Sequence, residues 1–163
     1  MTMAPNKSTQ SVIANDVTAR EIEYGEESPI LSSQFTSLTI EGIDEAVVLR
    51  YFQTMNAGEY DATAALFAPN GVMHPPFEQP IEGTDAIASY LKAEAKGMKL
   101  FPRKGTVETL ENDQVQFQLS GKVQTPVFGV NVGWIFILNA QREILYAKIK
   151  LLASPQELLS LRR

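Results

Sequence analysis

Several residue types are missing or scarce in this chain of 163 residues, and each absence excludes a class of function. There is no cysteine, which excludes disulfide bridges, thiolate metal sites, a cysteine nucleophile and thiol redox chemistry. The single histidine, His74, cannot build a multi-histidine metal site, and no carboxylate is placed to orient it as a base. We therefore expect His74 to have a structural role or to lie at the rim of a site.

Basic residues are outnumbered, 14 against 19 acidic ones, which gives a net charge of -5. Without a basic stripe, we expect no nucleic-acid partner. No apolar run approaches the ~20 residues of a membrane span, and the first residues lack the apolar centre of a secretory signal. These absences favour a soluble, acidic, cytoplasmic protein with a hydrophobic ligand.

The residues that are present are typical of a globular domain, with 44% apolar and 20% charged. The length fits one domain with a real core. Residues 1–37 are polar and lack a sustained apolar period, so we predict a partly disordered N-terminal arm, with one short helix around residues 16–24. The structured domain is expected over residues 38–163.

Apolar residues at a spacing of three to four predict three helices after residue 40. The first follows a cap at Asp44 and ends near residues 56–58. The second is capped by Asp61 and stopped by residues 69–71. The third runs from residues 83–85 to Gly97.

The remainder alternates or runs apolar, which predicts strands. Residues 72–77 form a short extended stretch interrupted by two prolines, and four longer strands are expected over residues 99–107, 114–125, 132–139 and 143–152. A short helix over residues 156–161 ends the chain. This order predicts an α+β fold in which a curved antiparallel sheet wraps around N-terminal helices and forms a cone with an apolar mouth.

Three strings in the second half carry a family resemblance: VMHPPF over residues 72–77, GKVQTP over 121–126 and LLASPQELL over 151–159. Together with Tyr51 and Trp134, they closely resemble the C-terminal domain of the cyanobacterial orange carotenoid protein, of the nuclear transport factor 2-like superfamily. The resemblance covers about residues 39–163. It implies a homologue of that domain alone, without a preceding helical carotenoid-binding domain.

The resemblance implies that Tyr51 and Trp134 donate hydrogen bonds to the ring carbonyl of a ketocarotenoid: canthaxanthin, echinenone or 3'-hydroxyechinenone. A phenol O–H and an indole N–H supply such donors on large apolar rings. Taken alone, a tyrosine at helical spacing and a strand tryptophan are more often plain core residues. Matching segments add the following wall residues, any one of which could equally be core: Met55, Pro76, Phe77, Leu100, Phe101, Val123, Thr125, Phe128, Phe136, Ile149 and Leu151.

The chain departs from the family pattern at two places. Val127 stands where the family has a tryptophan facing its partner domain, and the turn over residues 128–133 is shorter. Glu94 matches an acid that bridges to the helical domain in the family, and is equally well explained as a solvated carboxylate. Phe101 beside Pro102 is expected at the pocket rim, either packed on the ligand or partly plugging the entrance.

The function implied is ketocarotenoid binding, transfer to a helical carotenoid-binding protein, and quenching of singlet oxygen. An extended C40 carotenoid is about as long as a domain of this size is wide, and leaving half of it in water is unfavourable at ~25 cal/mol per Å². We therefore expect a homodimer that shares one carotenoid. Transient membrane contact near thylakoids is a further expectation, for pigment uptake.

The alternative is an enzyme, because the same superfamily hosts ketosteroid isomerase-like and polyketide cyclase-like activities with an acidic or histidine base inside the cone. Here Asp44, Glu45 and Glu59 are typical of helix starts or turns, and the predicted interior segments carry no carboxylate. We expect no enzymatic activity. A protein-interaction module is the third alternative.

Overall fold

The computed structural model describes residues 38–152, so the predicted N-terminal arm and C-terminal helix lie outside the described residues. Thr39 is the first residue of the compact unit to which all described elements belong. In chain order these are α2 (Ala46–Ala57), α3 (Tyr60–Ala64), β2 (Phe67–His74), β3 (Ile81–Glu82), α4 (Thr84–Glu94), β4 (Lys99–Thr109), β5 (Val115–Gln124), β6 (Gly129–Leu138) and β7 (Ile144–Leu152). The predicted α+β order is confirmed.

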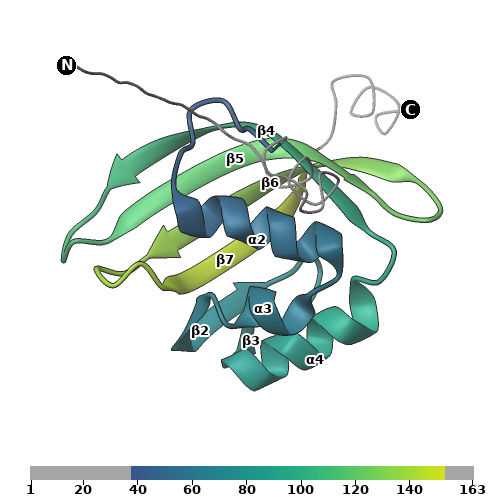
Figure 1. The fold of residues 1–163 in the computed structure, drawn as a ribbon, viewed down its shortest axis with the longest axis horizontal. Coiled ribbons are helices and arrows are strands. Elements are labelled where there is room, and N and C mark those ends of the chain that lie inside the picture. Colours follow the sequence, from purple (N-terminus) through teal and green to yellow (C-terminus); the bar gives the residue numbers. More distant parts are fainter. Residues whose placement is uncertain (1–37, 153–163) are drawn as a thin grey trace, which may run out of the picture. The chain divides into compact units, whose positions relative to one another are not determined.

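The strands form one six-stranded sheet in the order β3-β2-β7-β6-β5-β4. Strands β4 to β7 make the predicted antiparallel meander. Strand β2 joins it by pairing in parallel with β7, where Met73 lies opposite Ala147. The sheet is therefore mixed. The long strands curve over α2, while α3 and α4 lie beside β2 and β3 (Figure 1).

Helix α2 brings the first predicted site residue to the sheet. Its buried positions repeat every three to four residues, as expected of an amphipathic helix: Val48, Tyr51, Phe52 and Met55. The side chain of Glu45 accepts a hydrogen bond from the Val47 N–H, so the cap is one residue later than the predicted Asp44. Gly58 ends the helix at a φ of 76°, where glycine is unstrained.

The predicted second helix is wrong in length. Helix α3 ends at Ala64, Asp61 lies inside its first turn, and the segment expected to stop a helix instead belongs to β2. Phe67 is buried and pairs with Ile144, and a register irregularity before Val72 accommodates the intervening proline and glycine. Sheet pairing has overridden the local helical pattern.

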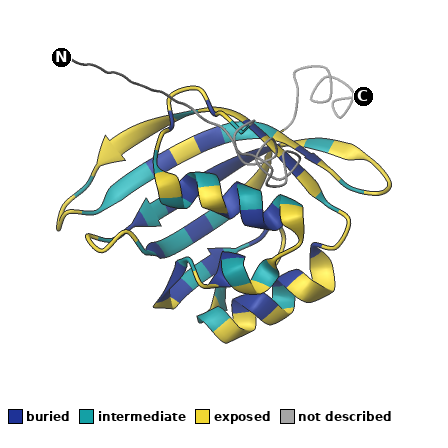
Figure 2. Ribbon diagram, viewed as in Figure 1, coloured by how far each residue is buried: buried dark blue, intermediate teal, exposed yellow. Residues whose placement is uncertain are grey.

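An aromatic cluster forms the centre of the core. The rings of Tyr51 and Phe136 have centroids 4.8 Å apart, and those of Phe52 and Trp134 are 4.9 Å apart, both edge to face. All four side chains are at most 2% exposed. Buried residues follow α2 and the strands that face it, whereas the hairpin tips are exposed (Figure 2). The core therefore fixes α2 against the concave side of the sheet.

Candidate functional site

A cavity of about 290 Å³ lies between helices α2 and α4 and the strands of the sheet. Most of its lining side chains are apolar. Strand alternation explains the contribution of β7, because Ile149 and Leu151 line the cavity while Lys150 between them is directed to the other face. The cavity is thus a product of the curved sheet and the helices packed beside it.

Tyr51 and Trp134 form the closed end of the cavity, since they are only 1% and 2% exposed. Tyr51 is held by edge contacts to Phe52 and Phe136, and Trp134 by an edge contact to Phe52. Well-packed aromatic side chains of this kind have little rotamer freedom. Their polar atoms are therefore fixed before any ligand arrives.

These two side chains make no hydrogen bond through the phenol O–H or the indole N–H within residues 38–152. Buried polar groups are hydrogen-bonded in the large majority of cases, so two unmet donors in one cavity call for an explanation. Burial, and to a smaller degree Tyr90, raises the pKa of Tyr51 well above its ordinary value, which keeps its O–H protonated. The closed end fits an acceptor atom on an otherwise apolar molecule.

The open end has the opposite character. Phe77 is 93% exposed, Phe128 56% and Leu151 46%, although all three line the cavity. The hydroxyl of Thr125 donates to the Phe128 carbonyl at 2.8 Å and accepts from the Phe128 N–H at 3.0 Å, so it shapes the turn. The mouth therefore offers apolar surface without free side-chain donors on this turn.

Comparison with known proteins shows what the chain is similar to. A family model described as a SnoaL-like domain matches residues 48–116. The chain is 41% identical over 133 residues to the orange carotenoid-binding protein of Limnospira maxima, and 41% identical over 132 residues to that of Synechocystis sp.. These alignments cover 79% and 78% of this chain but 42% of each relative, so the chain spans about two fifths of the length of the curated relatives.

A solved structure gives the same relationship. The orange carotenoid protein of Anabaena (Nostoc) sp., described as binding canthaxanthin, superimposes with a TM-score of 0.70 and 42% identity, covering 76% of this chain and 40% of that one. The chain has the nuclear transport factor 2-like fold and is similar to orange carotenoid proteins over about two fifths of their length. The fold and the family resemblance expected from the sequence are both confirmed.

Most wall residues implied by the orange carotenoid protein resemblance are brought together around the cavity. Alongside the donor pair, these are Met55, Pro76, Phe77, Leu100, Val123, Thr125, Phe128, Ile149 and Leu151. Phe136 is fully buried but is not part of the lining, and its ring instead packs against Tyr51. Its role is to support a lining residue.

Phe101 is the predicted wall residue that lies apart from the cavity. It is 51% exposed and absent from the lining, whereas its neighbour Leu100 is buried and lines the cavity. Adjacent residues of a strand point to opposite faces, so Phe101 lies on the face away from the cavity. Phe101 is therefore not among the residues that the structure brings together around the cavity.

Helix α4 and its flanks contribute lining residues that sequence reasoning had not assigned to the site. They include Tyr90, Leu91, Glu94, Ala95 and Met98, and the sheet adds Met73, Pro75, Val130 and Val132. The apolar spacing of α4 predicted a helix but not the surface on which it packs. Glu94 is exposed, and the acids weighed as catalytic candidates, Asp44, Glu45 and Glu59, lie outside the lining.

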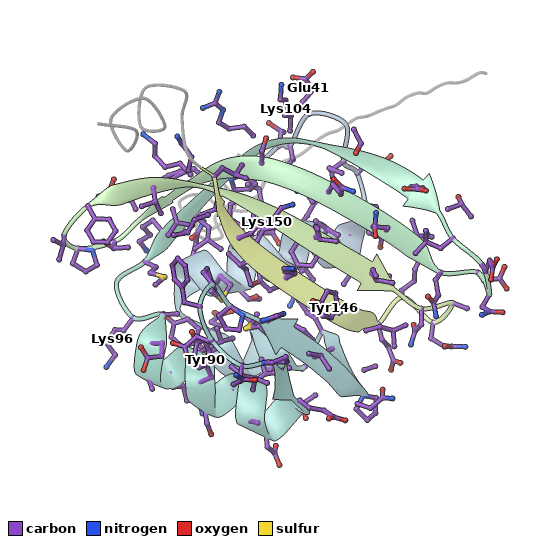
Figure 3. The ribbon with its side chains drawn as sticks, turned by 180° about the vertical axis from the view of Figure 1, so that it is seen from behind. Glu41, Tyr90, Lys96, Lys104, Tyr146 and Lys150 are labelled. Carbon is purple, nitrogen blue, oxygen red and sulfur yellow. The ribbon has the colours of Figure 1, made fainter. Side chains whose placement is uncertain are left out.

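His74 lies outside this lining as well. Its Nδ1 is 3.3 Å from the hydroxyl of Tyr146, a contact that joins β2 to β7. Tyr146 and Lys150 project from β7, while Tyr90 belongs to α4 (Figure 3). In residues 38–152 no three His, Asp or Glu side chains are grouped as a metal site would require. None of the described helices is long and apolar enough to cross a membrane.

Proposed function

We propose that this chain binds a ketocarotenoid by holding one keto ring in the cavity. The observation that carries the proposal is the pair of buried donors, Tyr51 and Trp134, which make no hydrogen bond within the described residues and lie at the closed end of an apolar cavity. A keto ring matches this arrangement, because it carries one carbonyl acceptor for the donors on a hydrocarbon that fits the apolar walls. The homology to orange carotenoid proteins supports the same ligand class.

The two donors and the walls contribute differently in this proposal. Each neutral hydrogen bond is worth about 0.5–1.5 kcal/mol net, so apolar contacts with the walls supply most of the affinity. The O–H of Tyr51 and the N–H of Trp134 set the depth and orientation of the ring. By drawing electron density toward the carbonyl, they also shift the absorption of the conjugated chain to longer wavelength.

The size of the cavity limits how much of the pigment it holds. At about 290 Å³ it is at the small end of ligand pockets, which span ~300–1,000 Å³. One ring and part of the chain fill it, and the rest of a C40 molecule extends past the exposed side chains of Phe77 and Phe128. We propose that a second copy of the chain covers this remainder, as a homodimer that shares one carotenoid.

A pigment that is shared between two protein copies can be delivered to another protein. Exchange of one copy for a helical carotenoid-binding protein transfers the carotenoid without leaving it in water. Uptake from a membrane near thylakoids and quenching of singlet oxygen by the bound pigment complete the proposed role. No catalysis is proposed, because the phenol and the indole at the closed end are not bases at neutral pH, and the carboxylate in the lining, Glu94, is exposed.

The test uses purified full-length chain mixed with canthaxanthin. We expect a coloured complex that elutes from gel filtration as a dimer, with one carotenoid per two chains by absorbance. A colourless protein after mixing contradicts carotenoid binding. A coloured monomer with one whole carotenoid per chain contradicts the shared dimer alone.

A further inference from the structure

A further phenol lies in the same cavity. Tyr90, on α4, is a half-buried lining residue on the side of the helix that faces the strands (Figure 3). It belongs to a third element, since Tyr51 lies on α2 and Trp134 on β6. The cavity therefore presents hydroxyl groups from two helices.

The tyrosines that line the cavity differ in hydrogen bonding from the described tyrosines that do not. Within residues 38–152, Tyr60 donates to the Ala95 carbonyl at 3.1 Å and the hydroxyl of Tyr146 is 3.3 Å from a His74 nitrogen, and neither lines the cavity. Tyr51 and Tyr90 both line it, and neither hydroxyl makes a hydrogen bond there. Of the tyrosines in residues 38–152, the two whose hydroxyls bond to no group there both line the cavity.

Tyr51 and Tyr90 line the same cavity of about 290 Å³ from two different helices. Tyr90 contributes to the raised pKa of Tyr51. The pKa of Tyr90 is itself raised, first by burial and then by Glu78 and Glu94. Tyr90 therefore stays protonated at neutral pH and can both donate and accept a hydrogen bond.

We propose that Tyr90 is a specificity-determining residue that hydrogen-bonds to a hydroxyl group on the bound keto ring, so that the site favours a 3-hydroxy-4-keto ring over an unsubstituted 4-keto ring. This rests on the proposed function. The carbon that carries the hydroxyl is bonded to the carbonyl carbon, so a ring held by Tyr51 carries its hydroxyl near Tyr51 as well. Moving a hydroxyl into an apolar cavity is unfavourable without a partner, and Tyr90 supplies one.

The test compares two ligands on three proteins. Canthaxanthin carries 4-keto rings and astaxanthin carries 3-hydroxy-4-keto rings, and quenching of the fluorescence of the single tryptophan reports binding of each. Tyr90→Phe should weaken astaxanthin binding by about two- to tenfold and leave canthaxanthin binding within about twofold. Tyr146→Phe is the matched control, which removes a phenol outside the cavity and should change neither affinity.

The ratio of the two affinities, taken on one preparation, cancels any loss of folded protein. An unchanged ratio in Tyr90→Phe overturns the specificity role and leaves the proposed function standing. Failure of the wild-type chain to bind either carotenoid overturns both.

Discussion

The two ends of the cavity differ in almost every physical property. At the closed end, Tyr51 and Trp134 are nearly inaccessible and are held by the rings of Phe52 and Phe136. At the mouth, Phe77 is almost fully exposed, and its backbone has a φ of 62°, in the left-handed region. One end is part of the protein core, and the other has no core to support it.

This difference assigns separate tasks to the two ends. The closed end is built by folding, so its geometry exists before a ligand binds and can set ring orientation and colour. The apolar side chains at the mouth remain in water unless a ligand or a partner covers them. Substitutions at the closed end should therefore lower the free energy of unfolding. Substitutions at the mouth should weaken ligand binding and leave the free energy of unfolding unchanged.

The largest expected effect is on stability. Phe52→Ala removes the ring that contacts both Tyr51 and Trp134 and is fully buried. It should lower the free energy of unfolding by about 3–5 kcal/mol, as large core truncations do. Urea denaturation measures this, and Phe77→Ala at the mouth should stay within about 0.5 kcal/mol of wild type. Equal losses would remove the distinction between the two ends.

The next effect is on pigment affinity. Phe128→Ser should weaken canthaxanthin binding by about 1.5–3 kcal/mol, because the ring is half-exposed in the chain alone and becomes buried against the pigment in the proposed complex. Its unfolding midpoint should not change. Val107→Ser is the control, since Val107 is 50% exposed but lies outside the lining. Similar affinity loss in both variants would contradict a specific role for the mouth.

A smaller effect appears at alkaline pH. The pKa of Tyr51 is raised by burial in the folded chain. In the unfolded chain the same side chain ionises at pH ~10. Above that pH the folded state retains a proton that the unfolded state has lost, so stability falls as pH rises, by at most about 1.4 kcal/mol per pH unit. Tyr51→Phe should flatten this alkaline decline in denaturation series between about pH 10 and 12. An equally steep decline in the variant would show that Tyr51 is accessible.

The sequence predicted local elements well and their partners less well. Helix α2, its end at Gly58 and the four-stranded meander follow from spacing and turn residues. The parallel pairing of β2 with β7 joins segments about 75 residues apart, which no local pattern encodes. Residues 67–74 illustrate the same limit, because burial of Phe67 against β7 outweighs a helical pattern.

The candidate site shows the same division. The family resemblance led to Tyr51 and Trp134, but strand alternation alone argued against placing both Leu100 and Phe101 on the cavity. Tyr90 was missed because an amphipathic pattern shows that a helix has a buried face, not which cavity that face borders. The hydrogen bonds of Tyr60 and Tyr146 became visible only in three dimensions.

The most direct test of the closed end is the absorption spectrum of bound canthaxanthin in the double variant Tyr51→Phe/Trp134→Phe. Both replacements keep an aromatic ring and remove only the donors, so pigment should still bind while the absorption maximum moves to shorter wavelength than in wild type. Tyr146→Phe should leave the maximum unchanged. An unshifted spectrum in the double variant would contradict the assignment of Tyr51 and Trp134 as the groups that hold the carbonyl.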